Sequence, residues 1–403
     1  MLRLLQGDVG SGKTIVAVLA MLQAVGSGYQ AAMMVPTDLL ALQQFNVLRD
    51  WLAPLGVSVG LLTGRQKASI KRANQASIES GEWSIVVGTH ALFQEAVSFK
   101  CLGLLVIDEQ HRFGVEQRMA FRNKGVEGDC KPHQLLMTAT PIPRTLAMIM
   151  YSDFSVSTID ELPPGRQPID TIMLCNTQRD RLIQRLASHC KKGQQAYWVC
   201  TLVEESEHFS AQAASELLDT LQLSLPGLKI GLAHGQLKSD KKEAVMSAFK
   251  LGEIDILVAT TVVEVGVDVS NATLMIIDNA ERLGLAQLHQ LRGRVGRGSA
   301  HSYCVLLYQS PLSAVALLRL KMLRSTQNGF LIAQEDLKIR GPGEVLGVRQ
   351  TGLMRFRVAD LVRDEKLLPL VLQAAERILS DYPGHVDLLK HRWLQGALKY
   401  REV

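Results

Sequence analysis

The chain has 403 residues, of which 47% are hydrophobic and 21% are charged, as in average globular proteins. This composition excludes a disordered or fibrous chain, and at about 150 residues per domain the length predicts two or three domains. Lys and Arg number 44 against 39 Asp and Glu, and the resulting net charge of +5 permits a polyanionic partner without identifying one.

Short apolar runs alternate with helical patterns from Met1 to about Ser155. Five of these runs are predicted to be buried parallel strands: Leu2–Gln6, Gln30–Val35, Ser84–Gly88, Leu102–Asp108 and Leu135–Thr138. Strands that alternate with helices predict a doubly wound α/β sheet, which we assign to residues 1–155. The Pro- and Gly-rich stretch Glu161–Pro168 breaks both periodicities, so we expect a linker over residues 156–170.

The alternation of strand and helix patterns resumes after this stretch. It predicts six more strands: Ile169–Leu174, Ala196–Cys200, Ile230–Ala233, Ile254–Ala259, Leu274–Asp278 and Tyr303–Leu307. We assign a second α/β domain to residues 171–310. Over residues 311–403 the strand patterns end, and a basic helical segment leads into the loop-like Arg340–Glu344 and then into further helices. The predicted fold class is α/β, with two tandem parallel sheets followed by a mainly helical C-terminal subdomain.

A phosphate-binding pattern stands close to the start of the chain. Gly7–Thr14 fits G-x-x-x-x-G-K-[ST] and lies between an apolar strand and a helix. In such a loop backbone N–H groups close around a β-phosphate, Lys13 reaches the β- and γ-phosphates, and Thr14 is a Mg²⁺ ligand. ATP and Mg²⁺ are therefore the predicted cofactors, and the predicted ATP-binding residues are Gly7, Asp8, Gly10, Ser11, Gly12, Lys13 and Thr14. The alternative is a Gly-rich turn with a solvated lysine, and the flanking strand and helix argue against it.

Two carboxylates follow the predicted strand Leu102–Asp108. Asp108 and Glu109 stand at its carboxyl end, where open α/β sheets bind ligands. Asp108 is predicted to hold Mg²⁺, and Glu109 to orient and polarise the attacking water. The alternative is an acidic turn that merely ends a strand, and the neighbouring P-loop argues against it.

A third catalytic candidate lies in the second half of the chain. Gln290–Arg297 carries Arg294 and Arg297 three residues apart beside glycines. Phosphoryl transfer needs cations where charge develops at the γ-phosphate, and an arginine from another domain makes catalysis depend on domain closure. A basic helical face in contact with solvent or with nucleic-acid phosphate is the alternative.

The sequence also predicts a compartment. Six cysteines are present without a C-x-x-C pair, and we interpret them as reduced thiols of a cytosolic protein. The uncharged stretch Ile15–Thr37 is divided by Gly26–Gln30 into a helix and a strand, which argues against a membrane span. The P-loop follows Met1 almost at once, so we expect no signal peptide and no membrane partner.

These segments together resemble superfamily-two helicases, and most closely the RecG family of bacterial ATP-dependent DNA helicases, over essentially the whole chain. The resemblance rests on Gly7–Thr14, Pro36–Leu40, Val87–Ala91, Asp108–Val115, Thr138–Thr145, His234–Gly235, Ala259–Asp268 and Gln287–Arg297. It implies two tandem RecA-like domains that hydrolyse ATP and act on branched or double-stranded DNA in recombination and repair. It also implies a single-stranded-DNA-binding protein as a partner, and we expect a monomer in the cytoplasm, associated with the nucleoid.

The resemblance assigns roles to matching positions. Lys13, Thr14, Asp108 and Glu109 would bind and hydrolyse MgATP. Gln290, Arg294 and Arg297 would sense and stabilise the γ-phosphate. Five further residues fall in or beside motifs that contact the nucleic-acid backbone: Thr37, Thr89, His90, His234 and Thr260. Backbone contact is what a translocase needs, because it must hold DNA without reading its sequence.

The segment Gln334–Glu344, with Gly347 and Gln350–Gly352, resembles the translocation motif that this family shares with the transcription-repair coupling factor. Arg319, Arg340 and Gln350 match its polar positions and would couple ATP-driven closure to DNA movement. The alternative is a C-terminal subdomain with ordinary surface charges. Pro342 between two glycines favours a shaped loop instead.

One departure from the family concerns the N-terminus. RecG proteins carry a wedge domain and an adenine-recognising segment before the P-loop, whereas six residues precede Gly7 here, so we expect a fragment or truncated form. Two alternatives to a RecG-type translocase core remain at this point. One is a translocase related to the coupling factor, and the other is a wedge-less DNA-binding remnant whose ATPase has decayed.

Overall fold

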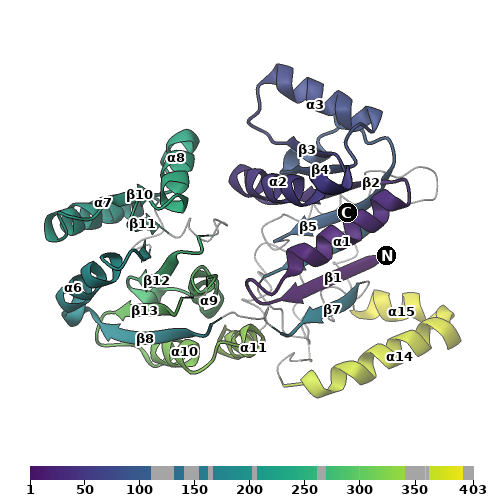
Figure 1. Cartoon of the computed structure of the whole chain (residues 1–403). Coiled ribbons are helices and arrows are strands. Elements are labelled where there is room, and N and C mark those ends of the chain that lie inside the picture. The colour runs from purple at the N-terminus through teal and green to yellow at the C-terminus, as the bar shows by residue number, and fades with distance from the viewer. Residues whose placement is uncertain are drawn as a thin grey trace.

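The computed structural model describes residues 1–109, 131–139, 154–161, 167–201, 207–260, 269–298, 300–340, 359 and 363–393. It contains two parallel sheets, one of seven strands and one of six, each flanked by helices. The two α/β units lie side by side, and helices follow the second unit (Figure 1). This arrangement confirms the predicted fold class.

The first sheet has the strand order β3-β4-β2-β5-β6-β1-β7, and all its pairs are parallel. Its strands are β1 Leu2–Gly7, β2 Gln30–Met34, β3 Val59–Leu62, β4 Ile85–Gly88, β5 Leu102–Asp108, β6 His133–Thr138 and β7 Ser155–Ile159. The two edge strands, β3 and β7, were not predicted from the sequence. β3 (Val-Gly-Leu-Leu) is short, contains a glycine and is only half-buried at two of its four positions, whereas β7 (Ser-Val-Ser-Thr-Ile) is polar and largely exposed, so it does not form the continuous apolar run by which buried strands are recognised.

The position of β7 corrects the predicted linker. Residues 155–159 pair with β1, from Arg3 opposite Ser155 to Gly7 opposite Ile159, and so belong to the first sheet. The second sheet begins at Ile169. The boundaries 156–170 are therefore wrong, and only residues between Ile159 and Ile169 can connect the two sheets.

The second sheet has the order β10-β11-β9-β12-β13-β8, again with parallel pairs only. Its strands are β8 Ile169–Cys175, β9 Gln195–Cys200, β10 Ile230–Ala233, β11 Ile256–Thr260, β12 Ala272–Ile277 and β13 Ser302–Tyr308. All six coincide with predicted strands to within two residues at each end, because each is a buried or half-buried apolar run between turns.

The helices cover both sheets and form the C-terminal part. They are α1 Lys13–Gly26, α2 Asp38–Leu52, α3 Ala68–Ser80, α6 Arg179–Cys190, α7 Glu207–Ser224, α8 Ser239–Lys250, α9 Leu285–Arg292, α10 Ala314–Ser325, α11 Gly329–Arg340, α14 Leu368–Asp381 and α15 Pro383–Trp393. Short 3₁₀ helices are η1 Ala53–Leu55, η2 His90–Phe93, η4 Asn176–Gln178, η6 Ala280–Arg282 and η7 Glu365–Leu367. Among the residues described, no helix has the length and apolar character needed to cross a membrane.

Each sheet has a core on both faces. In β5, Leu105 and Ile107 pack on one face while Leu104 and Val106 pack on the other, and all four are buried. Each such side chain stabilises the fold by roughly 1.5–3 kcal/mol through burial alone. Of the six cysteines, the five that the structure describes carry free thiols. Polar loops follow the carboxyl ends of the strands in both sheets, and the predicted site residues lie there.

Candidate active site

The P-loop takes the geometry that its glycines allow. β1 ends at Gly7 and α1 begins at Lys13, and between them Gly10 (φ 73°) and Gly12 (φ 92°) have left-handed backbone conformations. L-residues with a Cβ rarely adopt this region, so the two glycines permit the turn that aims the first backbone N–H groups of α1 at one point. The result is a cradle for an anion at a helix N-terminus.

Lys13 is positioned by the loop it follows. Its side chain is buried, and Nζ donates hydrogen bonds to the carbonyl oxygens of Gly7 at 2.9 Å and Asp8 at 2.8 Å. These bonds hold the ammonium group beside the cradle instead of leaving it in solvent. Gly7 contributes space as well, since a Cβ at this position would lie 2.5 Å from Oγ of Ser11.

The two carboxylates stand at the end of β5, as predicted. Burial, followed by the neighbouring charge of Glu109, raises the pKa of Asp108 to about 7, while the cations Lys13 and Arg294 act in the opposite direction. Glu109 has φ 53°, a left-handed conformation that is costly for a residue with a side chain. A buried carboxyl with a raised pKa beside two cations and a strained neighbour is typical of a catalytic centre.

The second unit brings its arginines to the same place. α9 ends at Arg292, and the chain then turns so that the N–H of Arg294 donates to Leu291 O at 3.0 Å. A Cβ on Gly293 would lie 2.7 Å from Cβ of Val9 in the P-loop. The absence of a side chain at Gly293 therefore allows the second unit to approach the P-loop closely.

A cavity of ≈ 300 Å³ lies at this junction. The candidate residues that line it come from both units: Gly10, Ser11, Gly12, Lys13, Thr14, Asp108, Glu109, Gln290, Arg294 and Arg297. The structure thus brings together all six residues predicted to be catalytic, together with the predicted metal ligands. The roles assigned to them stay predictions.

Two predicted ATP-binding residues do not line this cavity. Gly7 supplies a carbonyl group to Lys13, and the carboxylate of Asp8 faces His289 and the N–H of Gly329 instead. Conversely, Gln43 and Gln44 of α2 line the cavity and were not predicted. Only the packing of α2 on the sheet brings these two amides to the carboxyl ends of β1 and β5, and no motif marked them.

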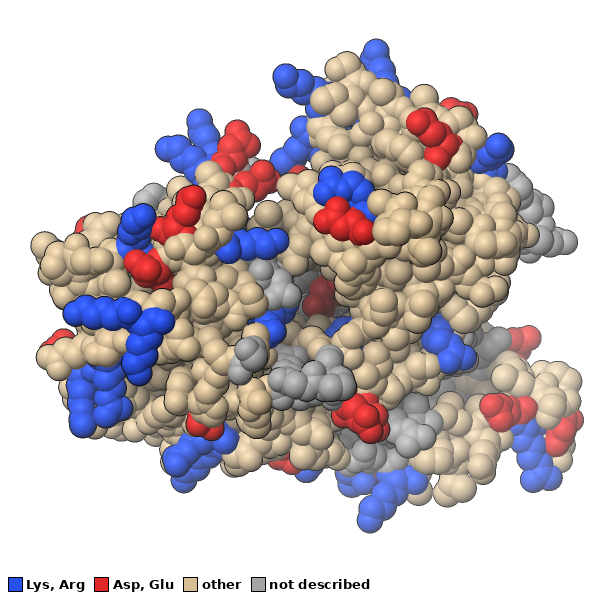
Figure 2. Space-filling view, viewed as in Figure 1, with Lys and Arg blue, Asp and Glu red and all other residues tan. Residues whose placement is uncertain are grey.

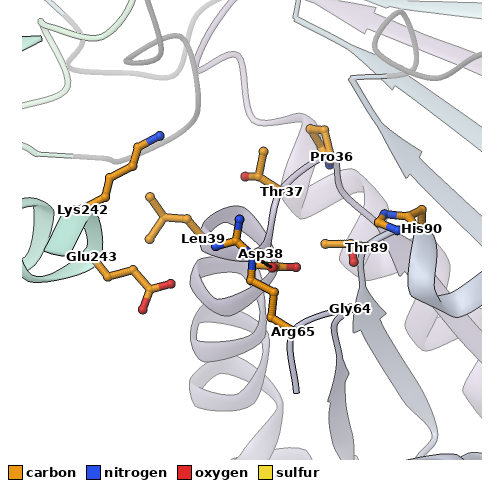
Figure 3. Close-up of a pocket in the computed structure, with 10 residues that line it drawn as sticks. All are labelled: Pro36, Thr37, Asp38, Leu39, Gly64, Arg65, Thr89, His90, Lys242 and Glu243. Atoms are coloured by element: carbon orange, nitrogen blue, oxygen red, sulfur yellow. Dashed lines mark ion pairs between the residues drawn. The ribbon is translucent and has the colours of Figure 1, made fainter. Parts of the chain in front are cut away.

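A second cavity, of ≈ 470 Å³, collects three of the residues predicted to contact DNA. Thr37, Thr89 and His90 line it from the first unit, and Lys242 and Glu243 of α8 face them from the second (Figure 3). Thr37 Oγ1 accepts a 3.4 Å hydrogen bond from Leu40 N and so caps α2. Thr89 Oγ1 is buried without a hydrogen-bond partner among the described residues. The cavity offers hydroxyl, imidazole and ammonium groups from both units to one ligand.

The remaining predicted DNA and translocation residues lie elsewhere. His234 follows β10, and burial and the charge of Lys242 lower its pKa, while Thr260 is buried at the end of β11. Arg319 of α10 donates to Leu283 O at 2.8 Å and Glu281 O at 3.2 Å, which joins α10 to the loop before α9. Arg340 ends α11, but its side chain and all of Gln350 lie outside the described residues.

On the face shown in Figure 2, the described Lys and Arg residues do not form one continuous positive patch. In Figure 2, Lys and Arg side chains are spread over the visible face with Asp and Glu among them, and the two units are separated by a hollow. A basic group gathers over α6, where Arg181, Arg185 and Lys192 line a further groove. The small net charge is thus distributed over both units.

Comparison with known families divides the chain into three matched stretches. Residues 3–149 match the DEAD/DEAH box helicase family, and residues 177–299 match the helicase conserved C-terminal domain. Residues 326–398 match the C-terminal part of domain 3 of ATP-dependent DNA helicase RecG.

Curated relatives and solved structures agree with these matches. The ATP-dependent DNA helicase RecG of Escherichia coli strain K12 is 57% identical over 401 residues, which are 99% of this chain and 58% of that protein. The corresponding protein of Aquifex aeolicus is 48% identical over 391 residues, covering 96% of this chain and 49% of the relative. The chain therefore spans between about half and three fifths of these relatives' length.

A solved structure of RecG bound to a three-way DNA junction has 44% sequence identity and a TM-score of 0.72, and the match covers 91% of this chain and 47% of that one. S. cerevisiae Dbp5 bound to RNA and ADP BeF3, with 17% identity and a TM-score of 0.57 over 93% of this chain and 89% of that one, shares the fold. Over the stretch that it spans, the chain is therefore similar to the RecG helicases.

Proposed function

We propose that the chain is the motor part of a RecG-type DNA helicase, which hydrolyses ATP, moves along double-stranded DNA and remodels branched DNA such as stalled forks and Holliday junctions. The observation that supports this most directly is the cavity at the junction of the two units. It joins the P-loop cation Lys13, the carboxylates Asp108 and Glu109, and the arginines Arg294 and Arg297 around one space of ≈ 300 Å³. Cations, a general base and an anion cradle are the groups that phosphoryl transfer requires.

Different residues of the chain would have different roles in ATP hydrolysis. The cradle and Lys13 would bind the β- and γ-phosphates and fix their position. Glu109 would accept a hydrogen bond from the attacking water and take up its proton as the water attacks the γ-phosphorus. Arg294 and Arg297 would stabilise the negative charge that develops on the γ-phosphate oxygens and on the leaving ADP.

The residues at the cavity also fit a divalent cation. Ser11 Oγ lines the cavity and is buried without a hydrogen-bond partner among the described residues, and the half-buried Asp108 lines the same cavity with a pKa that burial and the charge of Glu109 raise to about 7. Hydroxyl and carboxylate oxygens are the ligands that Mg²⁺ prefers. Thr14 and Asp108 would hold the ion. When bound, it would neutralise charge on the β- and γ-phosphates.

The division of the site between two units supports coupling to movement. Because the arginines belong to the second unit, hydrolysis would require the units to close, and release of products would let them open. The second cavity also has walls from both units, with Thr37 and Thr89 on one side and Lys242 on the other (Figure 3). Opening and closing of the units would therefore change the distance between the groups that would hold DNA phosphates. This change in distance would advance the motor along the strand.

The alternatives receive less support. A decayed ATPase would not be expected to keep all six candidate residues around one cavity. A relative of the coupling factor would share the translocation motif, but the C-terminal match is to RecG itself. Three further parts of the proposal rest on family resemblance alone: action as a monomer, association with a single-stranded-DNA-binding protein, and location at the nucleoid.

The test is steady-state ATPase activity with Mg²⁺, measured without DNA, with linear duplex and with a three-way junction. We expect turnover to rise at least about tenfold with the junction, as is typical when a partner completes a closed site. A Lys13→Ala variant purified in parallel reports contaminating activity. Turnover no higher than in that variant on any DNA would overturn the proposal.

A further inference from the structure

Asp8 connects three parts of the molecule. It is the second residue of the P-loop pattern, and its Oδ1 lies 2.6 Å from Nε2 of His289 in α9. Its other oxygen, Oδ2, accepts a 3.1 Å hydrogen bond from the N–H of Gly329, the first residue of α11. Asp8 thus bonds at the same time to the phosphate-binding loop's own backbone at Val9, to the second unit and to the C-terminal helices.

The bonding pattern fixes the state of His289. Its Nδ1 lies 2.9 Å from Nη2 of Arg292, and a guanidinium group can only donate. Nδ1 is therefore placed to accept from Arg292, which leaves Nε2 to donate to Asp8. The pKa of Asp8 is lowered although burial opposes this, because His289 and the N–H groups of Val9 and Gly329 donate to the carboxylate.

Arg292 extends the chain of hydrogen bonds to the end of α10. Its side chain is 2% exposed, and Nη1 donates to Leu323 O at 2.6 Å and Thr326 O at 2.9 Å. These carbonyl groups belong to the last turn of α10 and to the turn that leads into α11. A continuous path of polar contacts therefore runs from the P-loop through α9 to the end of α10, and the bond from Gly329 to Asp8 adds the start of α11, the helix that contains the first residues of the translocation segment.

Gly329 packs tightly against the pair of Asp8 and His289. A Cβ on Gly329 would lie 2.8 Å from Nε2 of His289 and 3.0 Å from Oδ2 of Asp8. A shift of the P-loop when phosphates enter the cradle must consequently move α9 and the start of α11 as well, or break the bonds to Asp8. α9 carries Gln290 at the cavity, and α11 ends at Arg340.

We propose that Asp8 and His289 are positioning residues that transmit the occupancy of the nucleotide cradle to α11, and so couple ATP hydrolysis to DNA movement. The inference rests on the proposed function and adds the contacts through which the nucleotide cradle would act on α11. Neither side chain lines the nucleotide cavity, so both act through the groups that they hold. The pair joins positions 281 residues apart, and no pattern in the sequence marked it.

The first experiment measures coupling in the full chain. His289→Ala is compared with the parent for ATP turnover and for displacement of a triplex-forming strand from duplex DNA. We expect the number of strands displaced per ATP hydrolysed to fall about tenfold in His289→Ala, because one contact that couples the two sites is lost. The affinity for an ATP analogue should stay within about threefold of that of the parent. An unchanged ratio of displacement to hydrolysis would overturn the inference.

Two variants control this experiment. His289→Gln retains an amide that can donate to Asp8 and accept from Arg292, so we expect it to recover most of the ratio. Asp170→Ala breaks the 2.8 Å pair with His301, a matched His–Asp contact on the surface of the second unit, and should leave the ratio unchanged. Losses of equal size in His289→Gln and His289→Ala would reduce His289 to a packing role and overturn the inference.

A second readout needs neither DNA nor turnover. Backbone hydrogen exchange of the first turn of α11 is measured in the parent with and without Mg²⁺ and a non-hydrolysable ATP analogue. We expect the analogue to change the exchange rate in the parent and in Asp170→Ala, but not in His289→Ala. A parent whose α11 does not respond, although its ATPase is stimulated by DNA, would refute the inference and leave the proposed function standing.

Discussion

The N–H of Glu109 donates a 3.0 Å hydrogen bond to Oδ1 of Asp108, the residue before it. This bond is made from a left-handed backbone conformation at Glu109, with φ 53°, which a residue with a side chain adopts only when its surroundings enforce it. This turn places both carboxylates at the end of one strand, close enough for the charge of Glu109 to raise the pKa of Asp108. Asp108 and Glu109 both line the cavity, where the charge of Lys13 acts on Asp108.

Glu109→Gln should separate binding from chemistry. The amide keeps the shape of the side chain but cannot take a proton from water, so we expect turnover to fall about 10²- to 10⁴-fold while ATP still binds. Rapid-quench kinetics together with a fluorescent-nucleotide titration measure the two quantities. A variant that lost nucleotide binding would show that Glu109 has a structural role in the cradle.

Lys13→Ala should abolish hydrolysis for a different reason. It removes the cation that the carbonyl groups of Gly7 and Asp8 hold beside the cradle. We expect at least about a hundredfold lower turnover together with weaker nucleotide binding, because the charge acts on both the ground state and the transition state. Turnover within a few-fold of the parent, measured by phosphate release, would contradict the assignment.

The raised pKa of Asp108 predicts a pH dependence of stability in the free chain. The pKa rises from 3.8 to about 7 on folding, so between these values the native state binds more protons than the unfolded state. Stability must therefore fall as pH rises through this window. Asp108→Asn removes the buried charge, and we expect its advantage over the parent to be larger at about pH 8 than at about pH 5. Urea denaturation with EDTA present, at both values, measures this, and an advantage independent of pH would contradict the shift.

Arg297→Ala should affect turnover more than nucleotide affinity. The cation is needed when charge develops at the γ-phosphate, so we expect turnover to fall about 10²- to 10³-fold and affinity to fall much less. Turnover under saturating ATP and binding of an ATP analogue are compared with the parent. Equal losses in both quantities would assign Arg297 to ground-state binding or to the turn in which its Nε donates to Gly293 O at 3.4 Å.

Arg340→Ala should uncouple the motor. The residue ends α11, outside both sheets, and it stands beside the Gly-Pro-Gly sequence that follows. We expect ATP hydrolysis to continue near the parent rate while displacement of a triplex-forming strand is lost. Lys338→Ala, which removes a surface pair with Glu335 on the same helix, is the control. Displacement at the parent rate with equal ATPase would make this segment a plain structural appendage.

Features that depend on residues close together in the chain could be predicted from their order alone. The P-loop is recognisable because its glycines must stand at fixed spacing between a strand and a helix, and β5 is recognisable because burial on both faces requires an apolar run. The same local rules failed at β7, a polar edge strand that is recognisable as a strand only from its pairing with β1.

Which residues far apart in the chain share a site depends on how the two units pack together. Arg294 and Lys13 line one cavity, and His289 bonds to Asp8, because two separately folded sheets place their loops against each other. Gly293 and Gly329 permit this approach by lacking side chains, a requirement that exists only once the units are in contact. A motif specifies the chemistry of the groups within it. The distance between groups far apart in the chain follows instead from the packing of whole domains, and no local pattern encodes that packing.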